Sequence, residues 1–313
     1  MRILITGATG FVGNILTRHL LATAPDAEIH GTSFGSQTGT PGISYHDVNL
    51  VEPDATFALV ERVMPDAIYH LAGQAFVPRS FENPWETLEI NIRAQLNIIQ
   101  ACLAFGLRPR LLITSSAEVY GDVQHVPISE DAPLRPSSPY SVSKAAQDLL
   151  GLQYFLSHQF PVLRARAFNH IGPGQSDRFV APAFAIQIAR IEAGQQAPTL
   201  YVGDLSDRRD FTDVRDIVRA YALIMERGTP GEVYNVASGE ARSVQSLLDT
   251  LLKHTTARID VQVDPQRLRP SRIPILQGDC TRLKNATGWQ PVIPFEQTLR
   301  DVLEDCRQRV TQA

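Results

Sequence analysis

The stretch RILITGATGFVG, residues 2–13, decides the fold. Residues 2–6 form a short apolar run of the kind that makes a buried parallel strand. Gly7, Gly10 and Gly13 follow in a G-x-x-G-x-x-G pattern, and residues 11–22 have the apolar spacing of an amphipathic helix. This order predicts a dinucleotide site, because the glycines let a pyrophosphate approach the amides at the helix start. A purely structural glycine turn is the alternative, and the position and flanks of the pattern disfavour it.

Outward from this unit, apolar strands alternate with helical stretches over much of the chain. Strands are predicted at 28–32, 43–45, 66–73, 110–114, 161–166 and 232–237, and helices at 53–63, 84–105, 138–158 and 214–226. Parallel strands need long crossover connections, and helices of this length supply them. The alternation therefore predicts the α/β class, with a doubly wound parallel (Rossmann) sheet.

The pattern changes beyond residue 170. Helices at 179–194 and 244–254 and short strands at 199–202 and 259–263 predict a smaller, interleaved α/β substrate-binding domain. We expect the dinucleotide-binding domain to consist of residues 1–169 and 210–237. The substrate domain would then consist of residues 170–209 and 238–313.

The bulk composition excludes several classes of protein. With 313 residues, 43% of them hydrophobic and 20% charged, the chain has the make-up of a globular enzyme. A net charge of −4 gives no reason to expect nucleic acid or an anionic membrane as a partner. Cys102, Cys280 and Cys306 form no C-x-x-C pair, so neither a disulfide framework nor a metal site is expected. With no secretory pattern at the start and no apolar run of ~18 residues, we expect a cytoplasmic protein.

A second informative stretch is LITSSAEVYGDVQHVPISEDAPLRPSSPYSVSK, residues 112–144. It begins in a buried strand and ends with Tyr140 and Lys144, one helical turn apart. A lysine ammonium there would stabilise the phenolate and lower the tyrosine pKa from about 10 towards neutrality, as proton transfer at a carbonyl oxygen requires. Ser115 or Ser116, at the end of the strand, could complete the hydrogen bonds around that oxygen.

Other predicted strand ends would meet the cofactor. The second strand ends in Thr32 and Ser33, without the acidic residue common in NAD sites or the arginine common in NADP sites, so the preference stays open. Asp47, after the third strand, could accept a hydrogen bond from an adenine or cap the next helix. His70 ends the fourth strand, before the small residues 71–73, and its place within a strand favours a structural role over a catalytic one.

Together these motifs resemble one family. The three glycines, the strand ending HLAG at 70–73, and Ser116 with Tyr140 and Lys144 look like the extended short-chain dehydrogenase/reductases that act on nucleotide sugars. The resemblance covers nearly the whole chain. Four stretches resemble the GDP-mannose branch more narrowly: HLAGQAFVPRSFENPWETLEIN (70–91), ARAFNHIGPGQ (165–175), GDLSDRRDFTDVRDIVRAY (203–221) and RLRPSRIP (267–274).

The resemblance implies an NADPH- or NADH-dependent enzyme that reduces the C4 ketone of GDP-4-dehydro-6-deoxy-D-mannose to GDP-D-rhamnose. It implies Tyr140 as the acid, Lys144 as its pKa tuner and ribose anchor, and Ser116 and Glu118 as further catalytic groups. The implied cofactor-binding residues are Gly7, Gly10, Phe11, Val12, Gly13, Thr32, Asp47, Val48, Leu71, Ala72, Gly73, Tyr140 and Lys144. The implied substrate-binding residues are Ser116, Asn169, Val180, Arg209 and Arg269. A homodimer joined through helices 91–105 and 139–158 is also implied.

The arginines suit this role because a guanidinium meets diphosphate oxygens in bidentate fashion. Surface ion pairs are the alternative for Arg209 and Arg269, and a turn cap is the alternative for Asn169.

One departure from the family pattern bears on the reaction. Dehydratases of the family have Thr-Asp-Glu or Thr-Ser-Glu at the strand end, whereas this chain has Ser116-Ala117-Glu118. Glu118 could still be a base, but Ala117 has no proton for a leaving hydroxyl, and this favours a reductase. The alternatives are a GDP-mannose 4,6-dehydratase, another nucleotide-sugar epimerase or dehydratase, and a non-catalytic nucleotide-binding protein, which the intact Tyr140–Lys144 pair disfavours.

Overall fold

The computed structural model describes residues 1–35, 39–268 and 273–312. Its largest sheet has seven strands in the order β10-β6-β5-β4-β1-β2-β3, and every neighbouring pair is parallel. The strands are β1 (Arg2–Thr6), β2 (Glu28–Ser33), β3 (Ser44–Asp47), β4 (Ala67–His70), β5 (Arg110–Ser116), β6 (Val162–Ala167) and β10 (Val233–Val236). The strand order reverses between β1 and β4, which opens a crevice at their carboxyl ends. The predicted doubly wound Rossmann sheet is confirmed.

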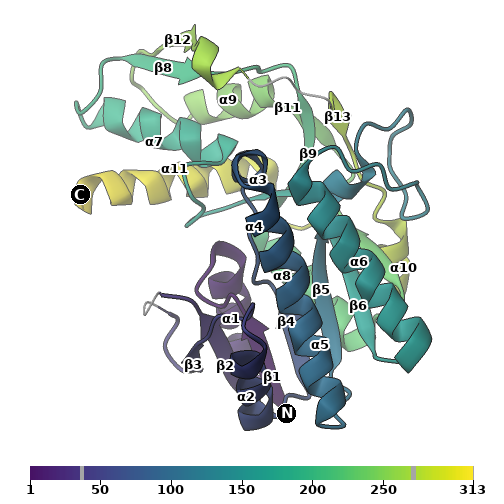
Figure 1. Cartoon of the computed structure of the whole chain (residues 1–313). Helices are drawn as coiled ribbons and strands as arrows, with labels where there is room; N and C mark the ends of the chain where they lie inside the picture. Colours follow the sequence, from purple (N-terminus) through teal and green to yellow (C-terminus); the bar gives the residue numbers. More distant parts are fainter. Residues whose placement is uncertain (36–38, 269–272, 313) are drawn as a thin grey trace.

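Helices cover both faces of this sheet (Figure 1). Ile3 and Ile5 of β1 face the core formed with α1 (Phe11–Thr23) and α8 (Val214–Arg227). Leu4, between them, faces the opposite core, formed with α2 (Pro53–Val63) and α5 (Ala94–Ala104). Successive strand side chains point to opposite faces, so a run of apolar residues fills both cores. The long helix α6 (Pro139–His158) packs on β5 and β6 beside α5.

A smaller lobe lies beyond the carboxyl ends of the large sheet (Figure 1). Its helices α7 (Val180–Glu192), α9 (Val244–Leu252) and α11 (Phe295–Gln312) share one apolar core. Its strands are β7 (Asn169–Ile171), β8 (Thr199–Val202), β9 (Arg208–Asp213), β11 (Ala241–Ser243), β12 (Asp260–Val263) and β13 (Ile275–Leu276). A short turn of helix, η3 (Pro265–Arg267), follows β12, and α10 (Thr281–Thr287) returns to pack on β10 and α8. Among the described residues, no helix is both long and apolar enough to cross a bilayer.

The helix predicted at 84–105 has an interruption. It consists of α4 (Pro84–Leu88), a π-helical turn η1 (Glu89–Arg93) and α5, and a short helix α3 (Val77–Glu82) precedes it. Asn91 lies inside the π-helical turn and is fully buried. A π turn inserts one extra residue, which redirects the side chains at that point, and apolar spacing in the sequence does not reveal it.

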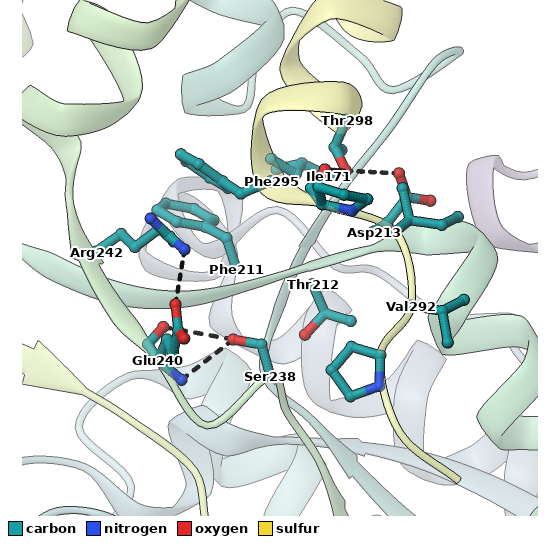
Figure 2. A pocket seen from close by; sticks show the side chains of 13 residues that line it. Ile171, Phe211, Thr212, Asp213, Ser238, Glu240, Arg242, Val292, Phe295 and Thr298 are labelled. Carbon is teal, nitrogen blue, oxygen red and sulfur yellow. Dashed lines mark hydrogen bonds and ion pairs between the residues drawn. The ribbon is translucent and has the colours of Figure 1, made fainter.

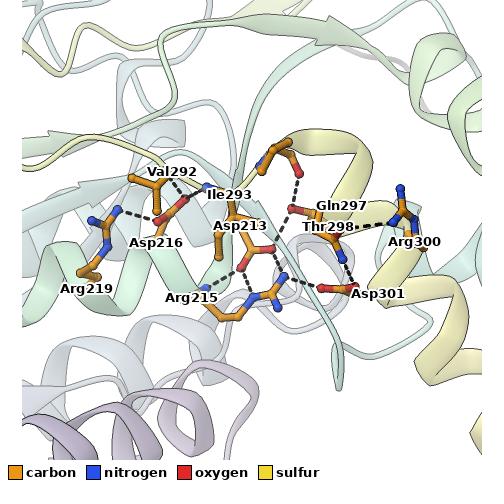
Figure 3. Close-up of polar contacts among 11 residues, drawn as sticks. Asp213, Arg215, Asp216, Arg219, Val292, Ile293, Gln297, Thr298, Arg300 and Asp301 are labelled. Carbon is orange, nitrogen blue, oxygen red and sulfur yellow. Dashed lines mark hydrogen bonds and ion pairs between the residues drawn. The ribbon is translucent and has the colours of Figure 1, made fainter.

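Two aspartates of the β9–α8 junction join the lobes (Figure 3). Asp213 caps α8, and its carboxylate also accepts a hydrogen bond from the Thr298 hydroxyl of α11 at 2.7 Å. Asp216 accepts from the backbone amides of Val292 and Ile293, both at 2.9 Å. Because α8 packs on the large sheet and α11 lies in the smaller core, these bonds fix one lobe against the other.

Candidate active site

The glycines of the turn between β1 and α1 allow backbone segments to pass very close to one another. Gly7 has φ +69°, which favours glycine, and a Cβ there would come within 3.0 Å of Ala72 at the end of β4. A Cβ on Gly13 would come within 2.1 Å of the Gly7 oxygen. Gly10, the N-cap of α1, has no side chain, so the helix start is open to an anion. This cradle fits the pyrophosphate of a dinucleotide.

Thr6 and His70 hold the neighbouring strand end in place. The Thr6 hydroxyl oxygen accepts from the amides of Leu71 and Ala72, both at 3.1 Å, so its own proton points to Nδ1 of His70 at 2.9 Å. Burial, together with the charge of Lys144, lowers the pKa of His70 to about 3. The imidazole is therefore neutral at any physiological pH, which agrees with the structural role predicted for it.

The residues at the ends of β2 and β3 are already engaged. The Thr32 hydroxyl accepts from Gly7 N at 3.1 Å and supports the glycine turn. Asp47 accepts from Gly35 N at 3.1 Å, and the N-cap of α2 is Glu52, so Asp47 does not cap that helix. Val48 donates its amide to Ser33 O at 3.1 Å, continuing the ladder between the two strands.

The catalytic pair predicted on one helix lies at the start of α6. Ser138 and Ser141 form a capping box around Pro139, which fixes where the helix begins. Lys144, 6% exposed, extends into the crevice, where its Nζ donates to Thr114 O at the end of β5 at 2.9 Å. Burial lowers the pKa of Lys144 to about 8.

Tyr140 differs from the prediction that its pKa would fall. Burial of the phenol raises its pKa, the charge of Glu118 raises it further, and only a hydrogen-bond contact with Ser116 acts in the opposite direction. The ammonium of Lys144 is held by a backbone carbonyl, and desolvation outweighs what its charge would contribute. Tyr140 thus keeps its proton at neutral pH.

Of the two serines left open by the sequence, Ser116 is the one beside Tyr140. Ser116 accepts from Glu118 N at 3.2 Å and starts the short helix η2 (Ala117–Tyr120). Ser115 is buried instead and lies 3.4 Å from Lys144 O, where it ties β5 to α6. Burial raises the pKa of Glu118, and the charge of Arg209 offsets part of this rise.

Asn91 is a residue of this region that the sequence reasoning did not single out for function. Its side-chain oxygen accepts from Gln74 N at 2.7 Å, and its nitrogen donates to Gln74 O at 3.1 Å and to the Ser143 hydroxyl at 2.8 Å. Ser143 in turn donates to Tyr140 O. Asn91 therefore links the loop after β4 to the start of α6, an arrangement that depends on the π-helical turn.

Apart from Ser116, Arg209 is the predicted substrate residue whose charge acts on a predicted catalytic group, Glu118. Asn169 is exposed on β7, and Val180 begins α7. Arg209 of β9 pairs with Asp207 at 2.9 Å, and its charge reaches Glu118. Arg269 lies outside the described residues.

A separate cavity of about 210 Å³ lies between β9 and the segment before α11 (Figure 2). Its walls combine apolar side chains, including Phe211 and Phe295, with polar ones, including the ion pair of Glu240 and Arg242 at 2.6 Å. Of the described residues that line it, none belongs to the predicted catalytic, cofactor or substrate sets.

The chain is similar to known proteins over nearly its whole length. A family model described as GDP-mannose 4,6 dehydratase matches residues 4–302. The chain belongs to this family. It is 39% identical to the GDP-6-deoxy-D-mannose reductase of Pseudomonas aeruginosa, over 99% of both chains. It is 28% identical to the GDP-mannose 4,6-dehydratase of Yersinia enterocolitica, over 99% of this chain and 94% of that protein.

Solved structures give the same result. The structure of RMD from Pseudomonas aeruginosa in complex with NADPH has a TM-score of 0.89 and 39% identity, with 98% of this chain and 99% of that chain covered. The UDP-glucose 4-epimerase of Thermus thermophilus with NAD has a TM-score of 0.87 and 28% identity, with 98% and 99% covered. The likeness to a family of nucleotide-sugar enzymes therefore extends over the whole chain.

Proposed function

We propose that this chain reduces the C4 ketone of GDP-4-dehydro-6-deoxy-D-mannose to GDP-D-rhamnose, with NADPH or NADH as reductant. The observation that carries the proposal is the 39% identity with a GDP-6-deoxy-D-mannose reductase over 99% of the chain, against 28% with a dehydratase. The NADPH held by the solved RMD structure supports the choice of cofactor.

We assign catalysis to Ser116, Glu118, Tyr140 and Lys144. Tyr140 is protonated at neutral pH, because burial and the charge of Glu118 raise its pKa, so it can donate a proton to the oxygen at C4. Ser116, in contact with Tyr140, would hold the same oxygen. Lys144 remains largely charged at neutral pH, below its pKa of about 8, and would hold ribose hydroxyls.

The cofactor would lie along the crevice at the carboxyl ends of β1, β2 and β4. The cradle around Gly7, Gly10 and Gly13 would hold the pyrophosphate, with Phe11 and Val12 at the helix start. The remaining contacts would come from Thr32, Asp47, Val48, Leu71, Ala72 and Gly73. A reduced nicotinamide bound there would supply the hydride.

The substrate would lie under the smaller lobe. Arg209 suits a diphosphate because its side chain is one-fifth exposed and its charge reaches Glu118. Asn169 and Val180 border the same region, and Arg269 completes the proposed set. We propose the same two-domain division as the sequence suggests, 1–169 with 210–237 and 170–209 with 238–313. The separate apolar core of α7, α9 and α11 supports it.

We also propose a cytoplasmic homodimer joined through α5 and α6. Free Cys102, Cys280 and Cys306 suit a reducing compartment. An exposed apolar row along α6, formed by Val142, Leu149 and Leu156, supports the interface.

A GDP-mannose 4,6-dehydratase is the second candidate, and Glu118 is the observation that favours it. Its pKa is raised by burial, as a general base working near neutrality requires. Ala117, however, is 1% exposed and occupies the place of the dehydratase acid without a group to give a proton.

Two incubations separate the candidates. GDP-mannose alone, and GDP-4-dehydro-6-deoxy-D-mannose with NADPH or NADH, are each given to the purified protein, and the products are identified. A reductase leaves GDP-mannose unchanged and makes GDP-D-rhamnose as nicotinamide absorbance falls. Conversion of GDP-mannose without added reductant, at a rate matching any reductase activity, would favour the dehydratase.

A further inference from the structure

A buried charged cluster lies behind the proposed catalytic groups. Asp148 of α6 is fully buried, and Arg164 and Arg166 of β6 are 6% and 4% exposed. Arg166 holds Asp148 in bidentate fashion, from Nε to Oδ2 at 2.8 Å and from Nη2 to Oδ1 at 3.0 Å, and Arg164 adds a third bond at 2.8 Å. Burial alone would raise the pKa of Asp148, but the hydrogen bonds and charges of Arg166 and Arg164 hold it below its usual value. The carboxylate is therefore ionised at neutral pH.

The guanidinium of Arg166 also contacts the segment that follows β5. Its Nη1 donates to the hydroxyl of Tyr120 at 3.0 Å and to Glu130 O at 2.9 Å. The group also lies over the Tyr120 ring, 5.1 Å from its centroid. The Tyr120 hydroxyl donates onward to Oδ1 of Asn235 on β10 at 2.6 Å. Tyr120 is itself fully buried, so both ends of its side chain are fixed.

The partners of Arg166 sit on the two segments that carry the proposed proton chemistry. Asp148 comes eight residues after Tyr140 on α6, about two helical turns. Tyr120 comes two residues after Glu118 within η2. One side chain of β6 thus contacts both the helix that holds the acid and the short helix that holds the neighbouring carboxyl.

We infer that Arg166 is a positioning residue that sets Tyr140 against Glu118. It acts through Asp148 on one side and Tyr120 on the other. A guanidinium suits this task because its N–H groups leave a rigid plane in fixed directions, whereas a lysine ammonium cannot hold both partners in one geometry. The inference rests on the proposed function, since it takes Tyr140 as the proton donor.

A mild variant and a more disruptive one test the positioning role of Arg166. Tyr120→Phe keeps the buried ring and removes only the hydroxyl that Arg166 and Asn235 share, and Arg166→Lys keeps the charge but loses the fork. Tyr234→Phe is the matched control. Tyr234 is 2% exposed on β10, and its hydroxyl accepts from Thr229 N at 2.9 Å, so this variant also loses a buried hydrogen bond.

The measurements are kcat and KM for the keto sugar, Kd for NADPH and Tm. We expect kcat to fall about tenfold in Tyr120→Phe and about a hundredfold in Arg166→Lys, with Kd for NADPH within about twofold of wild type, because a misplacement of ~1 Å is enough for such a loss. Tyr234→Phe should keep kcat within about twofold of wild type, even if its Tm falls as far as that of Tyr120→Phe.

A purely structural cluster would give another result. If Tyr120→Phe loses no more kcat than Tyr234→Phe at an equal loss of Tm, the inference is overturned, and this holds even if Arg166→Lys does not fold. Failure of the proposed function is a distinct outcome, since the wild type would then convert GDP-mannose without reductant. The kcat of each variant relative to wild type is then measured for the conversion of GDP-mannose, in which Tyr140 and Glu118 would also take part.

Discussion

The acid–base properties of Tyr140 and Lys144 follow from their burial. Desolvation disfavours the charged form of each, so it raises the pKa of the phenol and lowers that of the ammonium. A phenol that keeps its proton is suited to protonate an alkoxide as hydride arrives. The residues alone predict the pair and its one-turn spacing, but desolvation depends on what packs around them and is not visible in the sequence.

Tyr140→Phe should abolish most turnover, because it removes the phenolic proton that Tyr140 would donate. The expected loss is on the order of a hundredfold to ten-thousandfold in kcat, the usual contribution of a general acid. The Kd for NADPH, measured by fluorescence titration, should change little. This measurement controls for misfolding. Near-wild-type kcat in this variant would refute the assignment.

Lys144 should destabilise the folded protein at neutral pH. Its pKa is lowered to about 8 from an ordinary 10.5, so folding opposes its charge below pH 8, and this cost is relieved as pH rises from 8 towards 10.5. Lys144→Met should therefore raise the free energy of unfolding at pH 7 by on the order of 3 kcal/mol, and by less than about half of that near pH 9.5.

Urea unfolding at the two pH values measures this difference. Lys284→Met, at an exposed position, serves as the control and should change stability little at either pH. A gain from Lys144→Met that does not shrink as pH rises would show that the buried charge is not its source.

At the scale of elements, α6 has two roles on its two sides. Its inner side carries Tyr140 and Lys144, and its outer side exposes Val142, Leu149 and Leu156 by 43%, 53% and 65%. Residues seven apart lie on one face of a helix, so these three form an apolar row. Phe155 of the same helix packs towards Gly231 in its own chain.

The double variant Leu149→Glu with Leu156→Glu should make the protein monomeric. Two carboxylates in an apolar interface would lose hydration without gaining partners. Light scattering at micromolar concentration should then report the chain mass of 34.6 kDa, whereas the wild type should give twice this value. Val263→Glu is the control. Val263 lies on β12 and is 60% exposed, and this variant should leave the dimer intact. A monomeric wild type would contradict the proposed interface.

Local patterns predicted most of the large sheet, and the misses have physical causes. Apolar runs locate the strands, and the helix predicted at 138–158 is α6 (Pro139–His158). The π-helical turn around Asn91 escapes such reading, because the partners of Asn91 within it, Gln74 and Ser143, lie far away in the sequence. The hydrogen bond from Gly7 N to the Thr32 hydroxyl is likewise not visible in the sequence.

On the scale of the whole molecule, the substrate crevice depends on how the lobes are joined. Asp216 is 1% exposed and serves both lobes, accepting from two amides of the 292–293 segment while pairing with Arg219 at 2.6 Å. We therefore expect that removing the Asp216 carboxylate weakens the contact between the two lobes.

Asp216→Ala should lower the free energy of unfolding by about 3–5 kcal/mol, since it leaves two amides without their acceptor and removes the carboxylate partner of Arg219. Chemical denaturation measures this loss. Asp249→Ala on the exposed face of α9 is the control and should cost less than about 0.5 kcal/mol. Similar losses in the two variants would mean that the junction adds no stability of its own.

The central claim is the direction of hydride transfer, and isotope transfer tests it most directly. The protein is given GDP-4-dehydro-6-deoxy-D-mannose with NADPH that carries deuterium at the transferable position, and the product is analysed by mass spectrometry and NMR. We predict GDP-D-rhamnose with deuterium at C4 of the sugar, in proportion to the NADPH oxidised. A product without deuterium, with NADPH left unconsumed, would contradict the account.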